Sequence, residues 1–384
     1  MAHDLDTRAK MSTVTTTIAQ PANAQPFSLK LKHHDASYLP TSRFNTIGGL
    51  LKSNAAETGQ TPLICYPKEG AADFELHTGQ DLDRFTDAAV QFYLANGLEP
   101  ADPAAEKAPV VALLAPTTFA FVVSIFALNR LGWTALFLST RLTAPAYAKL
   151  LDKADCYRLI VPDSRRTVVD DICKDRPGCT SVPILQNKDF RDVPRAPQFR
   201  RQNVDPVKEA KKLAWILHSS GSTGFPKPIF ISNTACLANF RKSFGLRAFC
   251  ISPLFHSHGL MELGRAFYTR APMYLGNHSL PVTAQNLIDA VAVAKPQQIS
   301  AVPYVIQLLA EKEDGVRALA AVKLVLFAGS SCPDELGDRL VAKGVNLVAN
   351  YGSTEIGQIM TSFRLQETPS GSTCDCFGQH RTSR

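Results

Sequence analysis

The chain has 384 residues, of which 45% are apolar and 20% are charged. This is the composition of an ordinary globular protein, and it excludes a wholly disordered chain, a collagen and a small disulfide scaffold. At about 150 residues per domain, the length predicts two or three domains.

Much of the net charge of +7 lies in one stretch, between Gln186 and Lys212, which holds eight basic and four acidic side chains. A nucleic-acid-binding strip is one interpretation of this stretch. The mixed charges, the three prolines and the scarcity of aromatic side chains for base stacking favour a solvated basic linker over residues 186–212. We therefore expect no nucleic-acid partner.

The nine cysteines form no CxxC pair, which predicts reduced, mostly buried thiols and argues against a zinc ribbon or a thioredoxin-type site. The first twenty residues contain no apolar core of a secretory signal. The longest apolar run, Phe119 to Leu128, is too short to span a bilayer. We expect a cytoplasmic protein with no membrane span.

Strand and helix signals alternate after a polar segment at residues 1–42, which we predict to be a mobile arm. Residues 43–185 are predicted to form a first α/β subdomain. Its strands are expected at 63–66, 74–77, 110–115, 134–138 and 157–161, and its helices at 81–96, 119–131 and 146–153. Continuous apolar strands that alternate with helices are typical of a parallel α/β sheet.

The same alternation resumes after the linker, and residues 213–362 are predicted to form a second α/β subdomain. Its strands are expected at 213–217, 228–232, 247–251, 298–302, 323–327 and 346–349, and its helices at 234–242, 284–294 and 333–342. Asn233 is the expected N-cap of the first of these helices, and Pro333 is expected at the first position of the last. Residues 363–384 have no periodicity and are predicted to be an irregular tail.

The strongest motif lies between two predicted strands. It reads Ser219, Ser220, Gly221, Ser222, Thr223, Gly224, Phe225, Pro226 and Lys227. The two glycines permit positive φ and close backbone approach, while the hydroxyls, the backbone N–H groups and Lys227 suit an anion. The string predicts a polyphosphate-binding loop rather than a Ser/Gly-rich turn. It is not a Walker loop, because no Gly-Lys-Ser/Thr occurs.

Three further strings each follow a predicted strand, where ligands bind in open parallel sheets. In the string from Asn350 to Glu355, a tyrosine is placed to stack on a base, a threonine to donate to a phosphate oxygen and a carboxylate to hold Mg²⁺. Read alone, this string fits equally well an ordinary strand, turn and helix start. The others run from Pro253 to Gly259, where His256 and His258 are a weak metal pair, and from Ala328 to Ser331.

Together and in this order, the strings resemble the adenylate-forming superfamily of acyl-CoA synthetases, peptide-synthetase adenylation domains and luciferases. The phosphate loop matches the family pattern Ser/Thr-Ser/Thr-Gly-Ser/Thr-Thr-Gly-x-Pro-Lys at every defined position. Tyr351, Gly352, Thr354 and Glu355 match its Tyr-Gly-x-Thr-Glu string, and Phe255-His256-x-x-Gly259 matches its aromatic-His motif. The resemblance covers residues 46–361 and implies two stacked α/β subdomains with largely parallel sheets.

The resemblance also implies roles for individual residues. Ser219, Ser220, Gly221, Ser222, Thr223, Gly224 and Lys227 would surround the ATP phosphates. Gly329, Ser330, Tyr351 and Gly352 would line the nucleotide site, with Ser330 and Val302 also candidates for the wall of the acid pocket. Thr354 would bond the α-phosphate, Glu355 would bind Mg²⁺ and His256 would lie at the acid pocket. Lys227, His256, Thr354 and Glu355 are the expected catalytic residues.

The implied activity is ATP-dependent activation of a carboxylic acid as its acyl-adenylate, followed by transfer to the thiol of CoA or of a carrier protein's phosphopantetheine arm, as in secondary metabolism. His256 stands where amino-acid-activating members place an aspartate, so we expect an aryl or acyl acid without an α-amino group. A nucleotide-binding pseudoenzyme, or a partner-binding fragment of a degraded adenylation gene, is the alternative. A dinucleotide oxidoreductase is disfavoured because no GxGxxG follows a strand.

One departure from the family pattern lies at the C-terminal end. Family members continue after Tyr-Gly-x-Thr-Glu into a small barrel with a Thr-Gly-Asp string and then into a lid domain with a catalytic lysine. Only 29 residues follow Glu355, and they contain neither feature. The sequence therefore predicts an N-terminal portion of the catalyst, with barrel and lid missing and with doubtful activity of its own.

Overall fold

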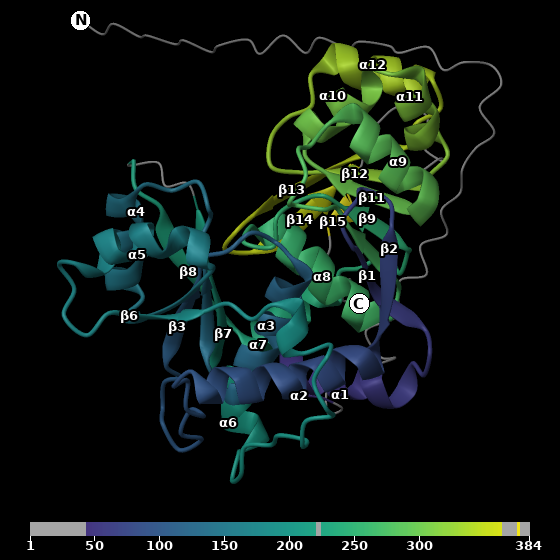
Figure 1. Ribbon diagram of the computed structural model, residues 1–384. Helices are drawn as coiled ribbons and strands as arrows, with labels where there is room; N and C mark the ends of the chain where they lie inside the picture. Colours follow the sequence, from purple (N-terminus) through teal and green to yellow (C-terminus); the bar gives the residue numbers. More distant parts are fainter. Residues whose placement is uncertain (1–43, 220–223, 363–374, 377–384) are drawn as a thin grey trace, which may run out of the picture.

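The computed structural model describes residues 44–219, 224–362 and 375–376. The predicted arm at residues 1–42, four residues of the phosphate loop and nearly all of the predicted tail lie outside the described residues. Within the described residues, the chain forms two α/β units, each built on one large sheet (Figure 1). The predicted α/β class is confirmed.

The first sheet has the strand order β6-β5-β3-β4-β7-β8. Its strands are β3 (Val110–Leu113), β4 (Thr134–Phe137), β5 (Arg158–Val161), β6 (Thr180–Pro183), β7 (Leu213–Ser219) and β8 (Lys227–Ser232). All neighbours pair in parallel except β7 and β8, which form an antiparallel hairpin. The phosphate loop is the connection of that hairpin.

The second sheet has the order β15-β14-β13-β12-β11-β9-β10-β1-β2. Its strands are β1 (Pro62–Pro67), β2 (Phe74–Thr78), β9 (Ala248–Cys250), β10 (Met273–Leu275), β11 (Gln298–Ala301), β12 (Leu324–Phe327), β13 (Leu347–Ser353), β14 (Gly357–Thr361) and β15 (Asp375–Cys376). The central strands are parallel, and β2, β14 and β15 are antiparallel additions at the two edges. Part of the predicted irregular tail is thus a short strand.

Helices separate and cover the two sheets, giving a layered α/β/α/β/α arrangement (Figure 1). The helices are α1 (Ile47–Glu57), α2 (Gly79–Ala95), α3 (Phe119–Leu131), α4 (Ala144–Lys153), α5 (Arg166–Cys173), α6 (Pro206–Lys211), α7 (Asn233–Phe240), α8 (Ser257–Thr269), α9 (Ala284–Ala294), α10 (Pro303–Ala310), α11 (Glu313–Ala320) and α12 (Asp334–Ala342). One core holds α1, α2, α3, α7 and α8 between the sheets. A second core packs α4 and α5 on the six-stranded sheet, and a third packs α9 to α12 on the nine-stranded sheet.

The period-two alternation of strand residues places each side chain in one of these cores. Val111 and Leu113 face the central core, whereas Ala112 faces α4 and α5. Helix α3 is buried along almost its whole length, which explains why the longest apolar run of the sequence is a helix that is apolar on all sides. No helix among the described residues is long and apolar enough to cross a bilayer.

Strands of the two units interleave along the chain. The early strands β1 and β2 lie in the nine-stranded sheet, while the later hairpin β7–β8 closes the six-stranded one. The division between the sheets therefore does not coincide with the predicted boundary at residues 186–212. The six-stranded sheet is built from one continuous part of the sequence, β3 to β8, which is inserted between β2 and β9 of the nine-stranded sheet.

The basic stretch at residues 186–212 is less solvated than the sequence predicts. It contains α6, and Arg201 pairs with Glu209 although only 8% of each side chain is exposed. Arg201 also lies against Gly132, where a side chain would collide with its guanidinium group. Phe190 is buried, and Arg191 pairs with Glu75 of β2.

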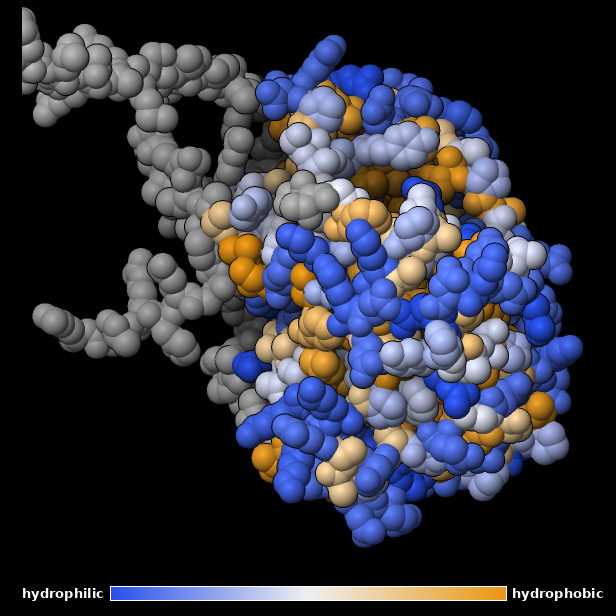
Figure 2. Space-filling model, turned by 90° about the vertical axis from the view of Figure 1, so that its left-hand side faces the viewer, coloured by the Kyte–Doolittle hydropathy of each residue, from blue (hydrophilic) through white to orange (hydrophobic). Residues whose placement is uncertain are grey.

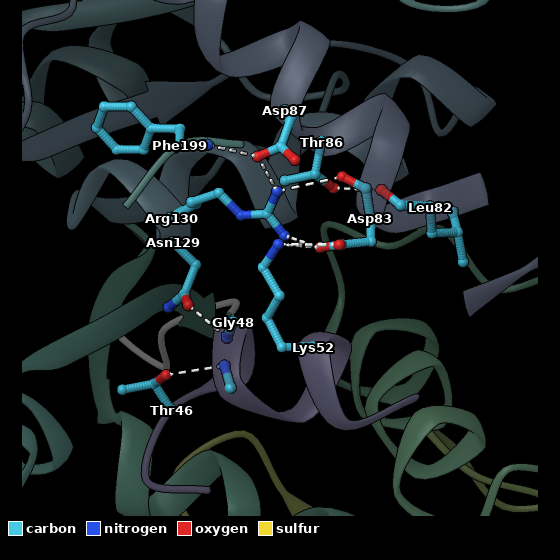
Figure 3. Close-up of polar contacts among 11 residues, drawn as sticks. Thr46, Gly48, Lys52, Leu82, Asp83, Thr86, Asp87, Asn129, Arg130 and Phe199 are labelled. Atoms are coloured by element: carbon cyan, nitrogen blue, oxygen red, sulfur yellow. Dashed lines mark hydrogen bonds and ion pairs between the residues drawn. The ribbon is translucent and has the colours of Figure 1, made fainter. Parts of the chain in front are cut away.

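An ion-pair network holds the first three helices together (Figure 3). Arg130 of α3 pairs with Asp83 and with Asp87 of α2, the latter over 2.6 Å, and only 7% of the arginine side chain is exposed. Lys52 of α1 reaches the same Asp83 over 2.8 Å. The first three helices are thus connected by partly buried charges, two basic and two acidic, that compensate one another.

The predicted elements are confirmed apart from shifts at their ends, and several details are corrected. Helix α7 is capped by Ser232, whose hydroxyl accepts from the Ala235 N–H over 3.2 Å, so the predicted Asn233 cap is wrong. Pro333 is the N-cap of α12 rather than its first residue. Cys173 and Cys179 form a disulfide, against the expectation of reduced thiols, while five other cysteines are free, namely Cys65, Cys156, Cys236, Cys250 and Cys332.

Candidate functional site

The phosphate loop connects the end of β7 to the start of β8. Ser219 and Lys227 face each other in register at its two ends. Gly224 has a φ of +89°, so the predicted need for a glycine there is confirmed. Ser220, Gly221, Ser222 and Thr223 lie outside the described residues.

A positively charged hollow of about 440 Å³ borders this loop. It is lined by Lys149, Asp152, Lys153, Phe225 and Lys227. The Lys149 ammonium lies 3.3 Å from the centre of the Phe225 ring, a cation–π contact that ties the loop to α4. Figure 2 views the molecule from this side and shows a mainly hydrophilic surface, with a hydrophobic hollow in its upper half.

The other predicted site residues gather at one edge of the nine-stranded sheet. Strands β9, β11, β12 and β13 are parallel neighbours, so their carboxyl ends lie side by side. His256, Val302, Gly329 and Tyr351 follow or end these strands. Gly329 has a φ of +94°, and a Cβ on it would lie 3.6 Å from Val302 Cγ1, so the segments after β11 and β12 touch.

A pair of histidines joins this edge to the phosphate loop. The ring of His256 lies 6.4 Å, centroid to centroid, from the ring of His218. His218 directly precedes Ser219 on β7 of the other sheet. The aromatic-His motif and the phosphate loop, which come from different sheets, therefore meet.

Both imidazoles of this pair are neutral at pH 7. Burial, followed by the charge of His256, lowers the pKa of His218 to about 4. Its Nε2 accepts the Ser139 N–H over 3.1 Å, so the proton lies on Nδ1. Desolvation by the surrounding chain, followed by the charge of Arg141, lowers the pKa of His256 from its ordinary 6.5.

Three residues of this region, His218, Arg141 and His278, were not found from the sequence. His218 has a weak signal, because it is the one polar residue among the five buried positions of β7 and stands next to the motif. Arg141 and His278 have none, although the charge of Arg141 contributes to lowering the pKa of His278, which burial brings to about 4. The charge of Arg141 thus acts both on His256, which follows β9, and on His278, which follows β10.

The Tyr-Gly-x-Thr-Glu string forms the tip of a β-hairpin. Tyr351 and Gly352 are the last part of β13, Thr354 and Glu355 lie in the turn, and β14 runs back antiparallel. The alternative interpretation of this string, a strand followed by a turn and the start of a helix, is therefore wrong. In Figure 1 the hairpin points from the nine-stranded sheet toward the side that carries α4 and β8.

Side chains at this tip are open to solvent. Tyr351 is 65% exposed, and Glu355 is exposed as well. No described residue forms an ion pair or hydrogen bond with the Glu355 carboxylate. One free carboxylate suits Mg²⁺, which takes one or two protein carboxylates and fills its other positions with phosphate oxygens and water.

The second histidine of the predicted weak metal pair is His258. It lies in α8, where its Nδ1 is 3.4 Å from Ser252 Oγ and burial lowers its pKa. Within the described ranges, no three His, Cys, Asp or Glu side chains cluster in a way that could hold a metal ion. Any metal at this site depends on its substrate for most of its ligands.

Comparison with known families agrees with this geometry. A family model described as "AMP-binding enzyme" matches residues 53–377. The chain is 26% identical to a carboxylic acid reductase of Neurospora crassa, over 64% of this chain and 25% of that protein. It is 28% identical to the adenylate-forming reductase stbB of Stachybotrys bisbyi, over 74% of this chain and 29% of that one. The chain thus spans less than a third of these relatives.

Solved structures give the same architecture. The N-terminal domain of FACL13 from Mycobacterium tuberculosis superposes with a TM-score of 0.68 at 18% identity, covering 83% of this chain and 78% of that one. The anthranilate CoA ligase AuaEII, in complex with anthranoyl-AMP, gives a TM-score of 0.66 at 20% identity, covering 85% and 62%. At these identities the likeness concerns the fold alone.

Proposed function

Because the chain belongs to the AMP-binding enzyme family, whose members are adenylate-forming enzymes, we propose that it binds ATP and activates a carboxylic acid as its acyl-adenylate. The observation that carries the proposal is the contact between His256 and His218. It brings the end of β9, where the acid would lie, beside the loop that would hold the ATP phosphates.

The nucleotide side of the proposed site is divided between the two sheets. Lys227 and the loop from Ser219 to Gly224 would hold the phosphates from the six-stranded sheet. Gly329, Ser330, Tyr351 and Gly352 would hold the adenosine from the nine-stranded sheet, with the solvent-exposed Tyr351 ring stacking on adenine. Thr354 would donate its hydroxyl to the α-phosphate.

Charge neutralisation is the main demand of the reaction. A carboxylate oxygen attacks the α-phosphorus, the bond to the bridging oxygen breaks, and pyrophosphate leaves with that electron pair. Two anions must therefore meet, which Lys227 and fixed loop N–H donors favour electrostatically. Mg²⁺, held by Glu355, supplies further positive charge at the phosphate oxygens when it is bound.

The acid side favours an aryl or acyl acid over an α-amino acid. The neutral imidazole of His256 cannot pair with an α-ammonium group as a carboxylate would, and Arg141 adds positive charge nearby. Relatives include a 4-hydroxybenzoate–CoA/benzoate–CoA ligase of Rhodopseudomonas palustris, 25% identical over 65% of this chain and 48% of that protein. A thiol of CoA or of a carrier protein would then accept the acyl group.

The test is an ATP–pyrophosphate exchange assay over a panel of benzoic, hydroxybenzoic, fatty and α-amino acids. We expect exchange with a carboxylic acid that has no α-amino group, and loss of exchange in Lys227→Met and Glu355→Gln. Fastest exchange with an α-amino acid would contradict the acid class. MgATP binding by calorimetry without exchange for any acid would favour a nucleotide-binding pseudoenzyme, and no MgATP binding would refute the proposal altogether.

A further inference from the structure

We propose that Asn239 and Lys242, at the end of α7, are positioning residues that hold the Thr354–Glu355 turn in place for MgATP. We call these two residues the α7 clamp. The inference rests on the proposed function for its effect on nucleotide binding, while its structural half concerns only the turn.

The α7 clamp binds the backbone on both sides of Gly357, the first residue of β14. Lys242 Nζ donates to the carbonyl oxygen of Gln358 over 2.7 Å. Asn239 Nδ2 donates to the carbonyl oxygen of Ile356 over 3.5 Å, a long contact. Ile356 directly follows Glu355, so the clamp reaches the chain one residue beyond the proposed magnesium ligand.

Gly357 is shaped to receive the clamp. Its φ is +74°, and a Cβ on it would lie 1.8 Å from Asn239 Nδ2. The amide of Asn239 therefore occupies the space that any other residue at position 357 would fill with its side chain. The position of the turn is set by a close contact with α7 as well as by its own hydrogen bonds.

Few hydrogen bonds within the turn itself stabilise its position. The bond from the Ile356 N–H to Ser353 Oγ is 3.4 Å long, and the side chains of Thr354 and Glu355 make no hydrogen bond to the described part of the chain. Across the hairpin, a Cβ on Gly352 would lie 2.3 Å from the Gly357 carbonyl oxygen. The turn is exposed to solvent, and the two glycines that face each other across the hairpin have no side chains to pack. Contacts from outside the hairpin are therefore needed to hold the turn in one conformation.

Asn239 is itself fixed by a buried polar network. Arg265 Nη2 donates to Asn239 Oδ1 over 3.1 Å, which directs the amide Nδ2 toward Ile356. Arg265 pairs with Glu262, and 6% and 5% of the two side chains are exposed. Removing any member leaves a buried group unpaired, so the network has one favoured arrangement.

The same network touches the acid side of the proposed site. The second carboxylate oxygen of Glu262 accepts from Gln298 Nε2 over 3.0 Å and from Ser300 Oγ over 3.1 Å. Gln298 and Ser300 belong to β11, which ends just before Val302, and α8, which carries Glu262, begins just after His256. One set of buried bonds thus holds both the acid-pocket segments and the metal-binding turn.

Hydrogen exchange of the ligand-free chain tests the structural half. In Lys242→Met, which keeps the aliphatic stem but removes the donor, and in Asn239→Ala, we expect faster exchange across residues 353–361 and unchanged exchange in β7 and β8. Lys343→Met and Asn286→Ala are matched controls, because Lys343 is exposed and Asn286 bonds a carbonyl of its own loop, at Pro281. Both should exchange like the parent chain.

MgATP affinity by calorimetry tests the functional half. We expect each clamp variant to bind MgATP about 10-fold more weakly, as supporting residues around a metal site commonly do. The Mg²⁺ concentration needed for half-maximal nucleotide binding should rise, and Lys343→Met and Asn286→Ala should change neither quantity.

A double-variant cycle tests the close contact at Gly357. Gly357→Ala should loosen the hairpin, because its methyl group collides with the Asn239 amide. In Asn239→Ala/Gly357→Ala that collision is gone, so the hairpin should exchange no faster than in Gly357→Ala alone. Additive effects would show that the two residues do not touch and would overturn the clamp.

The outcomes separate the inference from the proposed function. Parent-like exchange in both clamp variants would overturn the inference whatever the nucleotide data show. Faster exchange with unchanged MgATP affinity would overturn it as well, because the two residues would then be structural only. Absence of MgATP binding in the parent chain would instead overturn the proposed function, and with it the functional half of the inference.

Discussion

The imidazole of His218 lies next to the phosphate loop and close to His256. It is buried and neutral in the folded chain. Its pKa is lowered to about 4 from an ordinary 6.5, first by burial and then by His256. The unfolded chain therefore binds a proton more readily than the folded chain between these two pH values. Stability from this residue is complete above pH 6.5 and is lost as the pH falls toward 4.

We expect His218→Gln to flatten the fall in stability between pH 6.5 and 4. The glutamine carbonyl can still accept the Ser139 N–H, but it takes up no proton. At pH 4 the parent chain should lose up to about 3 kcal/mol through His218, and the variant should be spared that loss. Denaturant unfolding at several pH values measures it. An equal slope in both chains would show that His218 titrates normally.

Gly224 in the phosphate loop has a backbone conformation that residues other than glycine rarely adopt. Its φ is +89°, and among the described residues no atom beyond its chain neighbours lies within 4 Å of where a Cβ would be. Gly344, which follows α12, has a φ of +85° and equally open surroundings. Both positions therefore have a positive φ, and only Gly224 lies in the proposed site.

We expect Gly224→Ala and Gly344→Ala each to destabilise the fold by about 1 kcal/mol, because alanine is strained at positive φ. Gly224→Ala alone should also weaken MgATP binding, by about 10-fold or more, because the loop must approach the phosphates closely. Thermal unfolding and calorimetry measure the two effects. Equal nucleotide affinity in both variants would place the phosphates elsewhere.

At the scale of helices and strands, periodicity predicted six of the twelve helices of the described residues and missed α1, α5, α6, α8, α10 and α11, of which α8 has the longest buried run. Nine consecutive residues of α8, from Gly259 to Phe267, are buried, so the sequence shows no polar face. It also contains two glycines, which normally argue against a helix interior. Gly264 is needed because a Cβ there would lie 2.1 Å from the Phe240 ring of α7. Tertiary packing, not local preference, decides this helix.

The pair Gly264 and Gly337 tests that explanation. We expect Gly264→Ala to destabilise the fold by about 1–3 kcal/mol through overpacking against Phe240, although alanine favours helix. Gly337 lies inside α12 and would have only an ordinary contact of 3.9 Å, to Leu347, so Gly337→Ala should stabilise by about 0.5–1 kcal/mol. Chemical denaturation measures both. Stabilisation by both substitutions would refute the packing explanation.

For the whole molecule, the sequence predicted each site string at the end of a strand but not which strands are neighbours. His256, Gly329 and Tyr351 meet because β9, β11, β12 and β13 lie in that order, and strand order depends on long-range packing. The contact of His256 with His218 depends further on how the two sheets stack. Motifs of several residues could be found from the sequence, whereas single supporting residues such as Asn239 and Arg141 could not.

The way the two units are connected also predicts how the molecule unfolds. The six-stranded unit, β3 to β8, is inserted between β2 and β9 of the nine-stranded unit, so two connections join the units. They also share one core, which holds α3, α7 and α8 between the sheets. We therefore expect a single cooperative transition. Both tryptophans belong to the six-stranded unit, Trp215 on β7 and Trp133 just before β4, and both pack in or against the shared core, so their fluorescence reports on that unit and on its contact with the core.

Leu326→Ala in β12 probes this cooperativity from the opposite sheet. Leu326 is fully buried, and its truncation should cost about 2–5 kcal/mol. We expect tryptophan fluorescence and far-UV circular dichroism to give coincident transitions, both shifted to lower denaturant by the substitution. Val341→Ala on α12, where 51% of the side chain is exposed, should shift neither. An unchanged tryptophan transition in Leu326→Ala would mean that the six-stranded unit folds independently, and the shared core would then contribute little to its stability.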